Sequence, residues 1–126
     1  MDETGRWGVA EELAAEQILD AAESKIGIKE RIADEAKRIV TGARRTNYGA
    51  PENNFERIAR FWTAYLINVG KLAPGSAETH ISASDVSPMM RLMKEARLCE
   101  TPDHYDSHVD LVGYTLTGAE VNGVQG

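Results

Sequence analysis

The segment from Glu52 to Val69 constrains the fold more than any other part of the chain, because its apolar residues repeat at helical spacing. They form one continuous stripe: Phe55, Ile58, Ala59, Trp62, Tyr65, Leu66 and Val69. Such a stripe is typical of a helix that buries one face against other helices. Pro51 suits the first turn of this helix, since proline lacks the N–H that has no partner there. The segment therefore predicts an amphipathic helix within a helical protein.

Further segments repeat this pattern, with apolar residues three or four positions apart. The other predicted helices are Val9–Ser24, Lys29–Thr41, Ser82–Leu98 and Tyr105–Asn122. Ser82 and Asp85 resemble a capping box, and Pro88 predicts either a later helix start or a kink. No segment shows the alternation of a strand. We therefore expect an all-α fold, a compact helical bundle of about four core helices with an additional N-terminal helix.

The chain divides into a core and two ends. We expect an N-terminal helical extension over residues 1–28, a helical core domain over 29–122 and a frayed tail over 123–126. The apolar residues of the extension are mostly alanine, so we expect it to pack against a second subunit or loosely on its own core. A chain of 126 residues supplies one modest core. We therefore expect a homo-oligomer to complete it.

Composition narrows the functional class. Fourteen basic and twenty acidic residues give a net charge of −6, which argues against general nucleic-acid binding. Cys99 is the only cysteine, so the chain has neither a disulfide framework nor a cysteine-based zinc site. No apolar run reaches the length of a membrane span, and the first residues are acidic where a signal peptide is basic. We expect a cytoplasmic protein with no membrane partner.

Two pairs of carboxylates are candidate metal ligands. Glu52 and Glu56 lie one turn apart on the central helix, and Asp106 and Asp110 lie one turn apart on the last helix. Carboxylate oxygens suit Mg²⁺, and a cation would relieve the repulsion within each pair. The alternative is structural. Glu52 and Asp106 lie in first turns, where acids complement the helix dipole, and all four carboxylates could lie on solvated faces.

Basic residues in the middle of the chain are candidate phosphate ligands, because fixed cations bind phosphate oxygens strongly. Five residues are expected to contact a phosphorylated ligand: Arg44, Arg45, Tyr48, Lys94 and Arg97. The two arginines at 44 and 45 follow a helix-ending glycine, and the tyrosine could stack on the ligand. The alternative for the two helical cations is ion pairing with an acid: Glu56, Asp106 or Asp110.

Several ordered motifs resemble a family of small phage and prophage proteins of unassigned function. They cover about residues 32–120 and comprise YGAPENNFERIA from Tyr48, then Trp62, Tyr65-Leu66, Asp85-Val86, Met89-Met90, KEARL from Lys94 and DSHVDLVGY from Asp106. More distantly, the Tyr-Gly turn, the Lys/Arg helix and the Asp…Asp-Leu-x-x-Tyr helix are similar to the nucleotide-modification-associated proteins of phages. Through these they resemble the all-α, MazG-like nucleoside triphosphate pyrophosphatases.

The MazG-like resemblance implies a helical bundle, assembly into dimers or tetramers, and Mg²⁺ held by acidic pairs on two helices. Carried over by position, it implies four metal ligands: Glu52, Glu56, Asp106 and Asp110. Among these, Glu56 and Asp110 are the candidate catalytic acids. The same comparison places Lys94 and Arg97 on the phosphates. MazG-like enzymes space their acids three apart within each helix, whereas both pairs here are four apart.

Two functions follow from these expectations. In the first, the protein is an Mg²⁺-dependent hydrolase that splits the α–β phosphoanhydride of a nucleoside triphosphate with a metal-activated water and a carboxylate base. In the second, it binds a nucleotide without turnover, for instance as a phage-encoded sponge that sequesters a host defence signal in the host cytoplasm. An interaction module for phage DNA metabolism is a third reading. The acid spacing makes nucleotide binding a firmer expectation than nucleotide hydrolysis, and of the two functions the hydrolase is placed slightly ahead of the sponge.

Overall fold

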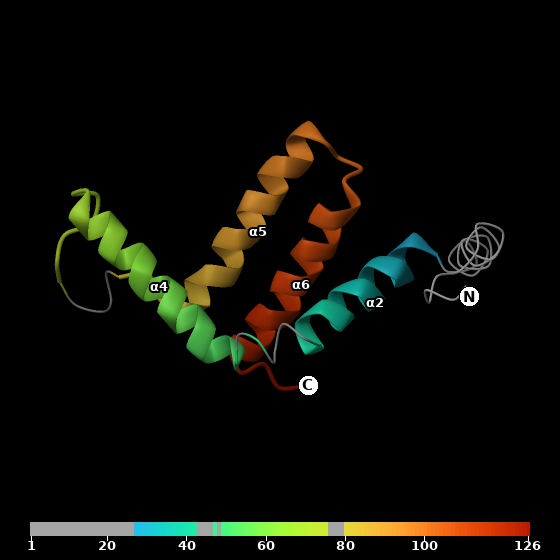
Figure 1. Ribbon diagram of the computed structural model, residues 1–126, viewed down its shortest axis with the longest axis horizontal. Coiled ribbons are helices and arrows are strands. Elements are labelled where there is room, and N and C mark those ends of the chain that lie inside the picture. The colour runs from blue at the N-terminus through green and yellow to red at the C-terminus, as the bar shows by residue number, and fades with distance from the viewer. Residues whose placement is uncertain (1–26, 43–46, 48, 76–79) are drawn as a thin grey trace, which may run out of the picture. The chain divides into compact units, whose positions relative to one another are not determined.

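The computed structural model describes residues 27–42, 47, 49–75 and 80–126. This part of the chain has four helices and no strand: α2 (Ile28–Thr41), α4 (Pro51–Asn68), α5 (Ala83–Glu100) and α6 (Tyr105–Val121) (Figure 1). The all-α prediction is confirmed. The predicted helix Val9–Ser24 lies outside the described residues. The chain separates into two units, residues 1–31 and residues 32–126, and the packing reported below lies within the second.

Helix α4 begins where the sequence predicts, with Pro51 in its first turn. Its buried residues recur every fourth position: Pro51, Phe55, Ala59 and Thr63. The predicted apolar stripe is buried over the N-terminal half of the helix, but Tyr65 and Val69 are 64% and 48% exposed. The hydrophobic core contacts α4 no further along than Trp62 and Thr63, where the Thr63 hydroxyl accepts a hydrogen bond from the Ile81 N–H at 3.0 Å. The stripe is therefore longer than the surface that covers it.

Helix α5 starts at Ala83 with the predicted capping box. The Ser82 N–H donates to Asp85 Oδ2 at 2.8 Å, which satisfies one donor of the first turn. Pro88 lies inside the helix, so the alternative of a later start is wrong. The sixth residue of a helix loses only one backbone hydrogen bond to proline, and the cap already fixes the preceding turn.

Helices α5 and α6 lie side by side and are joined by residues 101–104 (Figure 1). Their contact is close because Gly118 faces Ser87, where a Cβ on the glycine would lie 2.5 Å from Ser87 Oγ. The Ser87 hydroxyl donates to the Tyr114 carbonyl at 2.6 Å. This pairing supplies most of the helix packing and leaves one edge of α6 to meet α2 and α4.

The hydrophobic core of this unit centres on three buried residues from α4 and α5: Phe55, Ala59 and Val86. Partly buried side chains pack around them: Ile58, Trp62, Ile81, Ala83, Met90, Tyr114 and Val121. Ala36 and Val109 are also buried. The core therefore holds the start of α4 against α5 and α6, which is where the candidate site lies.

Candidate functional site

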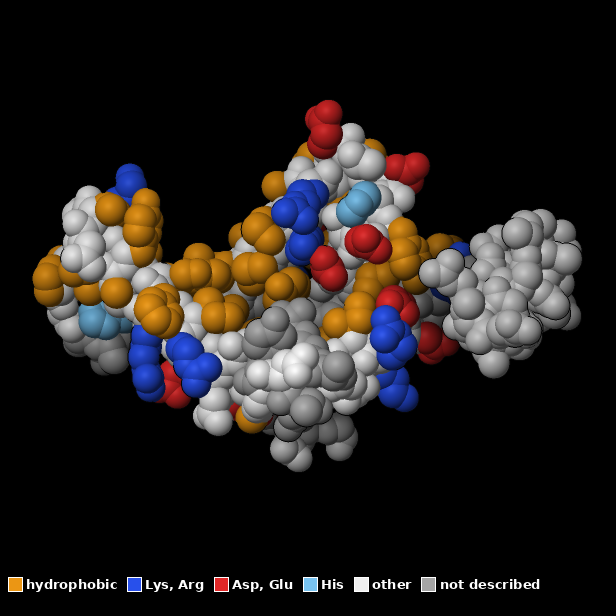
Figure 2. Space-filling model, viewed as in Figure 1, with side chains coloured by type: hydrophobic (Ala, Val, Ile, Leu, Met, Phe, Trp, Pro, Cys, Tyr) orange, Lys and Arg blue, Asp and Glu red, His pale blue; other side chains and the backbone are white. Residues whose placement is uncertain are grey.

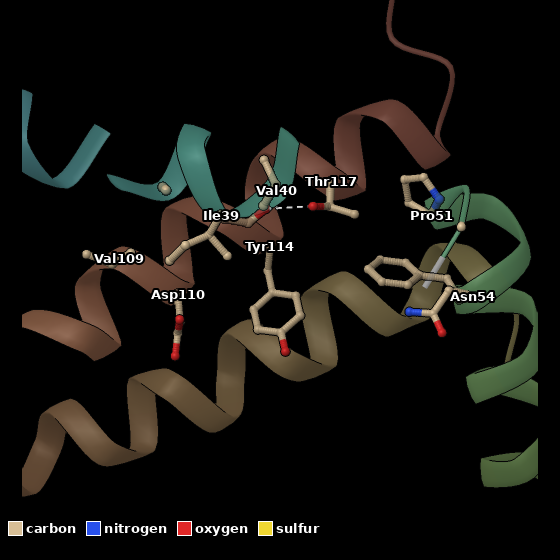
Figure 3. Close-up of a pocket in the computed structure, with 12 residues that line it drawn as sticks. Ile39, Val40, Pro51, Asn54, Val109, Asp110, Tyr114 and Thr117 are labelled. Atoms are coloured by element: carbon tan, nitrogen blue, oxygen red, sulfur yellow. Dashed lines mark hydrogen bonds between the residues drawn. The ribbon is translucent and has the colours of Figure 1, made fainter. Parts of the chain in front are cut away.

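A narrow slot lies where α2, the start of α4 and α6 meet (Figure 3). Its empty space is about 570 Å³ when the open mouth is included, but only about 40 Å³ of it admits the centre of a water-sized sphere. The lining is mainly apolar, with a few polar groups: Ala36, Ile39, Val40, Gly49, Pro51, Asn54, Phe55, Val109, Asp110, Gly113, Tyr114 and Thr117. An apolar cleft with few convergent polar groups is the usual form of a small-molecule site.

Asp110 and Tyr114 supply the polar edge of the slot on α6. They are one turn apart, so both side chains project from the same face, toward α5 (Figure 3). From α5, Lys94 Nζ lies 2.9 Å from Asp110 Oδ2. The side chain of Lys94 is 10% exposed and that of Asp110 is 38% exposed. A buried ammonium needs such a partner, and the pairing fixes the carboxylate at the wall of the slot.

The start of α4 forms the opposite wall. Phe55 is buried at 3% exposure, and the Asn54 side chain lies beside it in the lining. The residue before the helix, Ala50, offers no side-chain cap to the first turn. The N-terminal end of α4 therefore presents backbone N–H groups and the positive end of a helix dipole near the slot.

Helix α6 approaches α2 through Gly113. A Cβ built on this glycine would lie 3.4 Å from Val40 Cγ1, an ordinary packing distance. The Thr117 hydroxyl, which also lines the slot, donates to the Gly113 carbonyl at 2.9 Å. Gly113 therefore lies in the contact between α6 and α2 that closes one side of the slot, and this contact has room for a Cβ.

The four predicted metal ligands are not brought together. Glu56 forms an exposed ion pair with Arg60 at 2.7 Å, and Asp110 is paired with Lys94. Glu52 and Asp106 are exposed on different helices. Within the described ranges, no group of three or more His, Cys, Asp or Glu residues could hold a metal ion. As placed here, these carboxylates do not fit a shared Mg²⁺ ion, because two of them already neutralise cations.

Lys94 was predicted either to bind phosphate or to pair with an acid, and in the structure it forms an ion pair with Asp110. Arg97 is exposed on α5 and does not line the slot. Three of the predicted ligands lie outside the described residues: Arg44, Arg45 and Tyr48.

The sequence analysis did not identify three polar or aromatic residues as part of a site: Asn54, Phe55 and Tyr114. The spacing of Asp110 and Tyr114 on one helix face was the available signal for the α6 wall.

Elsewhere, on α2, Arg38 donates to Glu35 at 2.6 Å, and this hydrogen bond lowers the pKa of that carboxyl group. That pair does not line the slot.

Comparison with known proteins places this all-helical, slot-bearing domain among phage proteins. The chain belongs to the family described as Domain of unknown function (DUF6378), which matches residues 31–122. It is 40% identical over 87 residues to the Gene 55 protein of Mycobacterium phage D29, covering 69% of this chain and 50% of the relative. It is 38% identical over 79 residues to the Gene 55 protein of Mycobacterium phage L5, covering 63% and 44%.

The chain therefore spans about half the length of the curated relatives it matches. The expected resemblance to a phage family of unassigned function is confirmed, whereas the MazG-like similarity stays a prediction. No solved structure matches the chain. Each of the described helices is too short or too polar to span a lipid bilayer.

Proposed function

We propose that this protein binds a nucleotide or nucleotide-derived small molecule in the slot and holds it without turnover. The observation that carries the proposal is the Asp110–Lys94 ion pair at the edge of an apolar slot walled by Phe55 and Tyr114. Aromatic and apolar walls suit a planar base, and a fixed carboxylate suits its N–H groups. In this arrangement the base enters the slot and the phosphates remain at its mouth.

The phosphate end of the ligand is assigned to the start of α4. The first turn lacks a side-chain cap, and a helix N-terminus attracts anions through its N–H groups and dipole. Arg44 and Arg45 precede Gly49, a lining residue, by four or five positions in the sequence. We keep both arginines as proposed phosphate ligands.

Capture is favoured over hydrolysis by the state of the carboxylates. Asp110 and Glu56, the two candidate catalytic acids, each form an ion pair with a cation, and this supports capture over hydrolysis. Binding without turnover requires only shape and hydrogen bonding. A phage protein of this kind would act in the host cytoplasm by lowering the free concentration of a nucleotide signal.

The test is calorimetric titration with nucleoside mono- and triphosphates and cyclic dinucleotides, each with Mg²⁺ and with a chelator, alongside a pyrophosphate-release assay. We expect binding that survives chelation, with no pyrophosphate released. Asp110→Asn should change the affinity, while Asp106→Asn, one turn away and exposed, should not. Absence of binding across the whole panel would refute the proposal, and metal-dependent pyrophosphate release would establish the hydrolase instead.

We also propose that the protein self-associates through its exposed apolar surface. Among the described residues, nine large hydrophobic side chains are exposed and only five hydrophobic residues are buried. Figure 2 shows apolar side chains gathered over α4 and α5 on one face. Exposed apolar patches of this kind mark interaction sites, and a second copy is the commonest partner of a soluble chain.

A further inference from the structure

We propose that the slot selects guanine among the nucleobases. This inference rests on the proposed function, because it names the base that the same slot would accept. Its starting point is Asp110, which is the one carboxylate among the described residues of the lining. A carboxylate accepts hydrogen bonds and donates none, so the group that meets it must present N–H or O–H donors. A phosphate presents neither, which places the base, rather than the phosphates, against Asp110.

The five common bases differ in what their pairing edge offers to a carboxylate. Guanine has two adjacent donors, the ring N1–H and the 2-amino group, spaced to meet both carboxylate oxygens. Adenine and cytosine place an acceptor ring nitrogen beside their amino group, and uracil and thymine place their single N–H between two carbonyl oxygens. Each of these four directs an acceptor lone pair at the carboxylate. Only guanine meets Asp110 without such a repulsive contact.

Lys94 acts on this recognition through Asp110. Its ammonium occupies one oxygen of the carboxylate at 2.9 Å, and each oxygen can accept more than one hydrogen bond. The carboxylate therefore keeps lone pairs for a ligand while its position is fixed from α5. Lys94 does not line the slot. It is a positioning residue, whereas Asp110 is the specificity-determining residue.

The lining of the slot suits a flat ring. The cavity is small and opens into a larger hollow at its mouth. Phe55 and Tyr114 line it with aromatic rings, and the Asn54 amide, with both a donor and an acceptor, is available to the remaining polar edge of the base. A purine presents a larger face to such walls than a pyrimidine does.

The experiment compares guanosine, inosine, adenosine and xanthosine monophosphates by calorimetric titration against the wild-type protein. Inosine monophosphate differs from the guanine nucleotide only by the missing 2-amino group. We expect it to bind at least about tenfold more weakly, because Asp110 would lose one partner in a desolvated site. Guanosine triphosphate and cyclic diguanylate, titrated in parallel, distinguish a free nucleotide from a cyclic dinucleotide as the source of the base.

Asp110→Asn tests the assignment independently, because it should reverse the preference between guanine and xanthine. An amide can donate to the 2-carbonyl of xanthine, so this variant should lose the preference for guanine and gain affinity for xanthosine monophosphate. Asp106→Asn should keep the wild-type order of affinities. Equal binding of the guanine and inosine nucleotides by the wild-type protein would overturn the guanine assignment and leave the proposed function intact. Failure of every nucleotide to bind would overturn both. The wild-type comparison decides the question even if Asp110→Asn does not fold.

Discussion

Lys94 Nζ on α5 lies 2.9 Å from Asp110 Oδ2 on α6, and the lysine is the more buried of the two side chains. The ion pair therefore joins α5 and α6, the two helices that contact each other most extensively. It also fixes the Asp110 side chain at the wall of the slot. The stability of the fold depends on burying the ammonium with a partner, whereas in the proposed function the carboxylate is the group that contacts the ligand.

The first prediction concerns this ion pair. Asp110→Ala should lower the free energy of unfolding by about 1–3 kcal/mol, less than for a fully buried pair because Asp110 is 38% exposed. The loss arises because Lys94 would remain buried without its partner. Urea denaturation measures the change. Combining Asp110→Ala with Lys94→Met should recover much of the loss, since the ammonium is then gone.

The matched control is the exposed pair on α4, Glu56 with Arg60. Glu56→Ala should cost no more than about 0.5 kcal/mol, as is usual for solvated pairs one turn apart on a helix. If both alanine variants cost the same, the Lys94–Asp110 pair contributes nothing beyond a surface ion pair.

These pairs also show what the sequence could predict. Glu56 and Arg60 are four residues apart on one helix, so their pairing follows from local geometry. Lys94 and Asp110 are on different helices, and the sequence could offer that pair only as one of several alternatives. The helix boundaries and the Ser82 capping box depend on neighbours in the chain, which is why they were predicted well.

The slot depends on the meeting of three helices, and periodicity does not determine which helices meet. The same limit explains the error at Tyr65 and Val69. Helical spacing shows which face of α4 is apolar, but not where the covering helices end. Both residues were expected to be buried and both are exposed.

The second prediction concerns the contact between α5 and α6. Gly118→Ala should destabilise the protein by about 1–3 kcal/mol, because the added Cβ would lie within 2.8 Å of two Ser87 atoms. This cost exceeds the roughly 1 kcal/mol that alanine gains over glycine in a helix. Thermal denaturation followed by circular dichroism is the measurement. Adding Ser87→Gly should restore part of the stability, since it removes the clashing side chain.

Gly113→Ala is the matched control on the same helix. Its Cβ would meet Val40 at an ordinary 3.4 Å, so the change should be neutral or stabilising. A larger loss at Gly113 than at Gly118 would show that the α5–α6 contact is not the tightest packing of α6.

The third prediction concerns the start of α6. His104 Nδ1 accepts a hydrogen bond from the Ser107 N–H at 3.2 Å and caps the helix. His104→Ala should lower the free energy of unfolding by about 1 kcal/mol, whereas His104→Asp should retain most of it, because aspartate is a strong N-cap. Chemical denaturation of the three proteins at neutral pH provides the comparison. Equal losses in both variants would mean that the cap does not stabilise α6.

The last prediction concerns self-association. Phe61 and Tyr65 lie one turn apart on α4, Val69 caps its C-terminal end, and all three are exposed, with Phe61 at 71%. A groove on the other side of α5, lined by Pro88, Leu92, Leu111 and Val112, is also apolar. Arg91 and Glu95 both line this groove, and Arg57 lies one turn before Phe61, so the proposed contact would pair Glu95 of one copy with Arg57 of another. We propose that α4 of one copy occupies the groove of another.

Light scattering at micromolar concentration should then give a mass of at least two chains, and Phe61→Ser should lower it toward one chain. Loss of the exposed phenylalanine removes apolar area at the proposed interface without opening the hydrophobic core. The charge-reversed variant Glu95→Arg should weaken association, and Glu95→Arg with Arg57→Glu should restore it. The control is Leu116→Ser, an exposed residue of α6 outside both surfaces, which should leave the mass unchanged. A wild-type protein that is monomeric at this concentration would contradict the proposed contact.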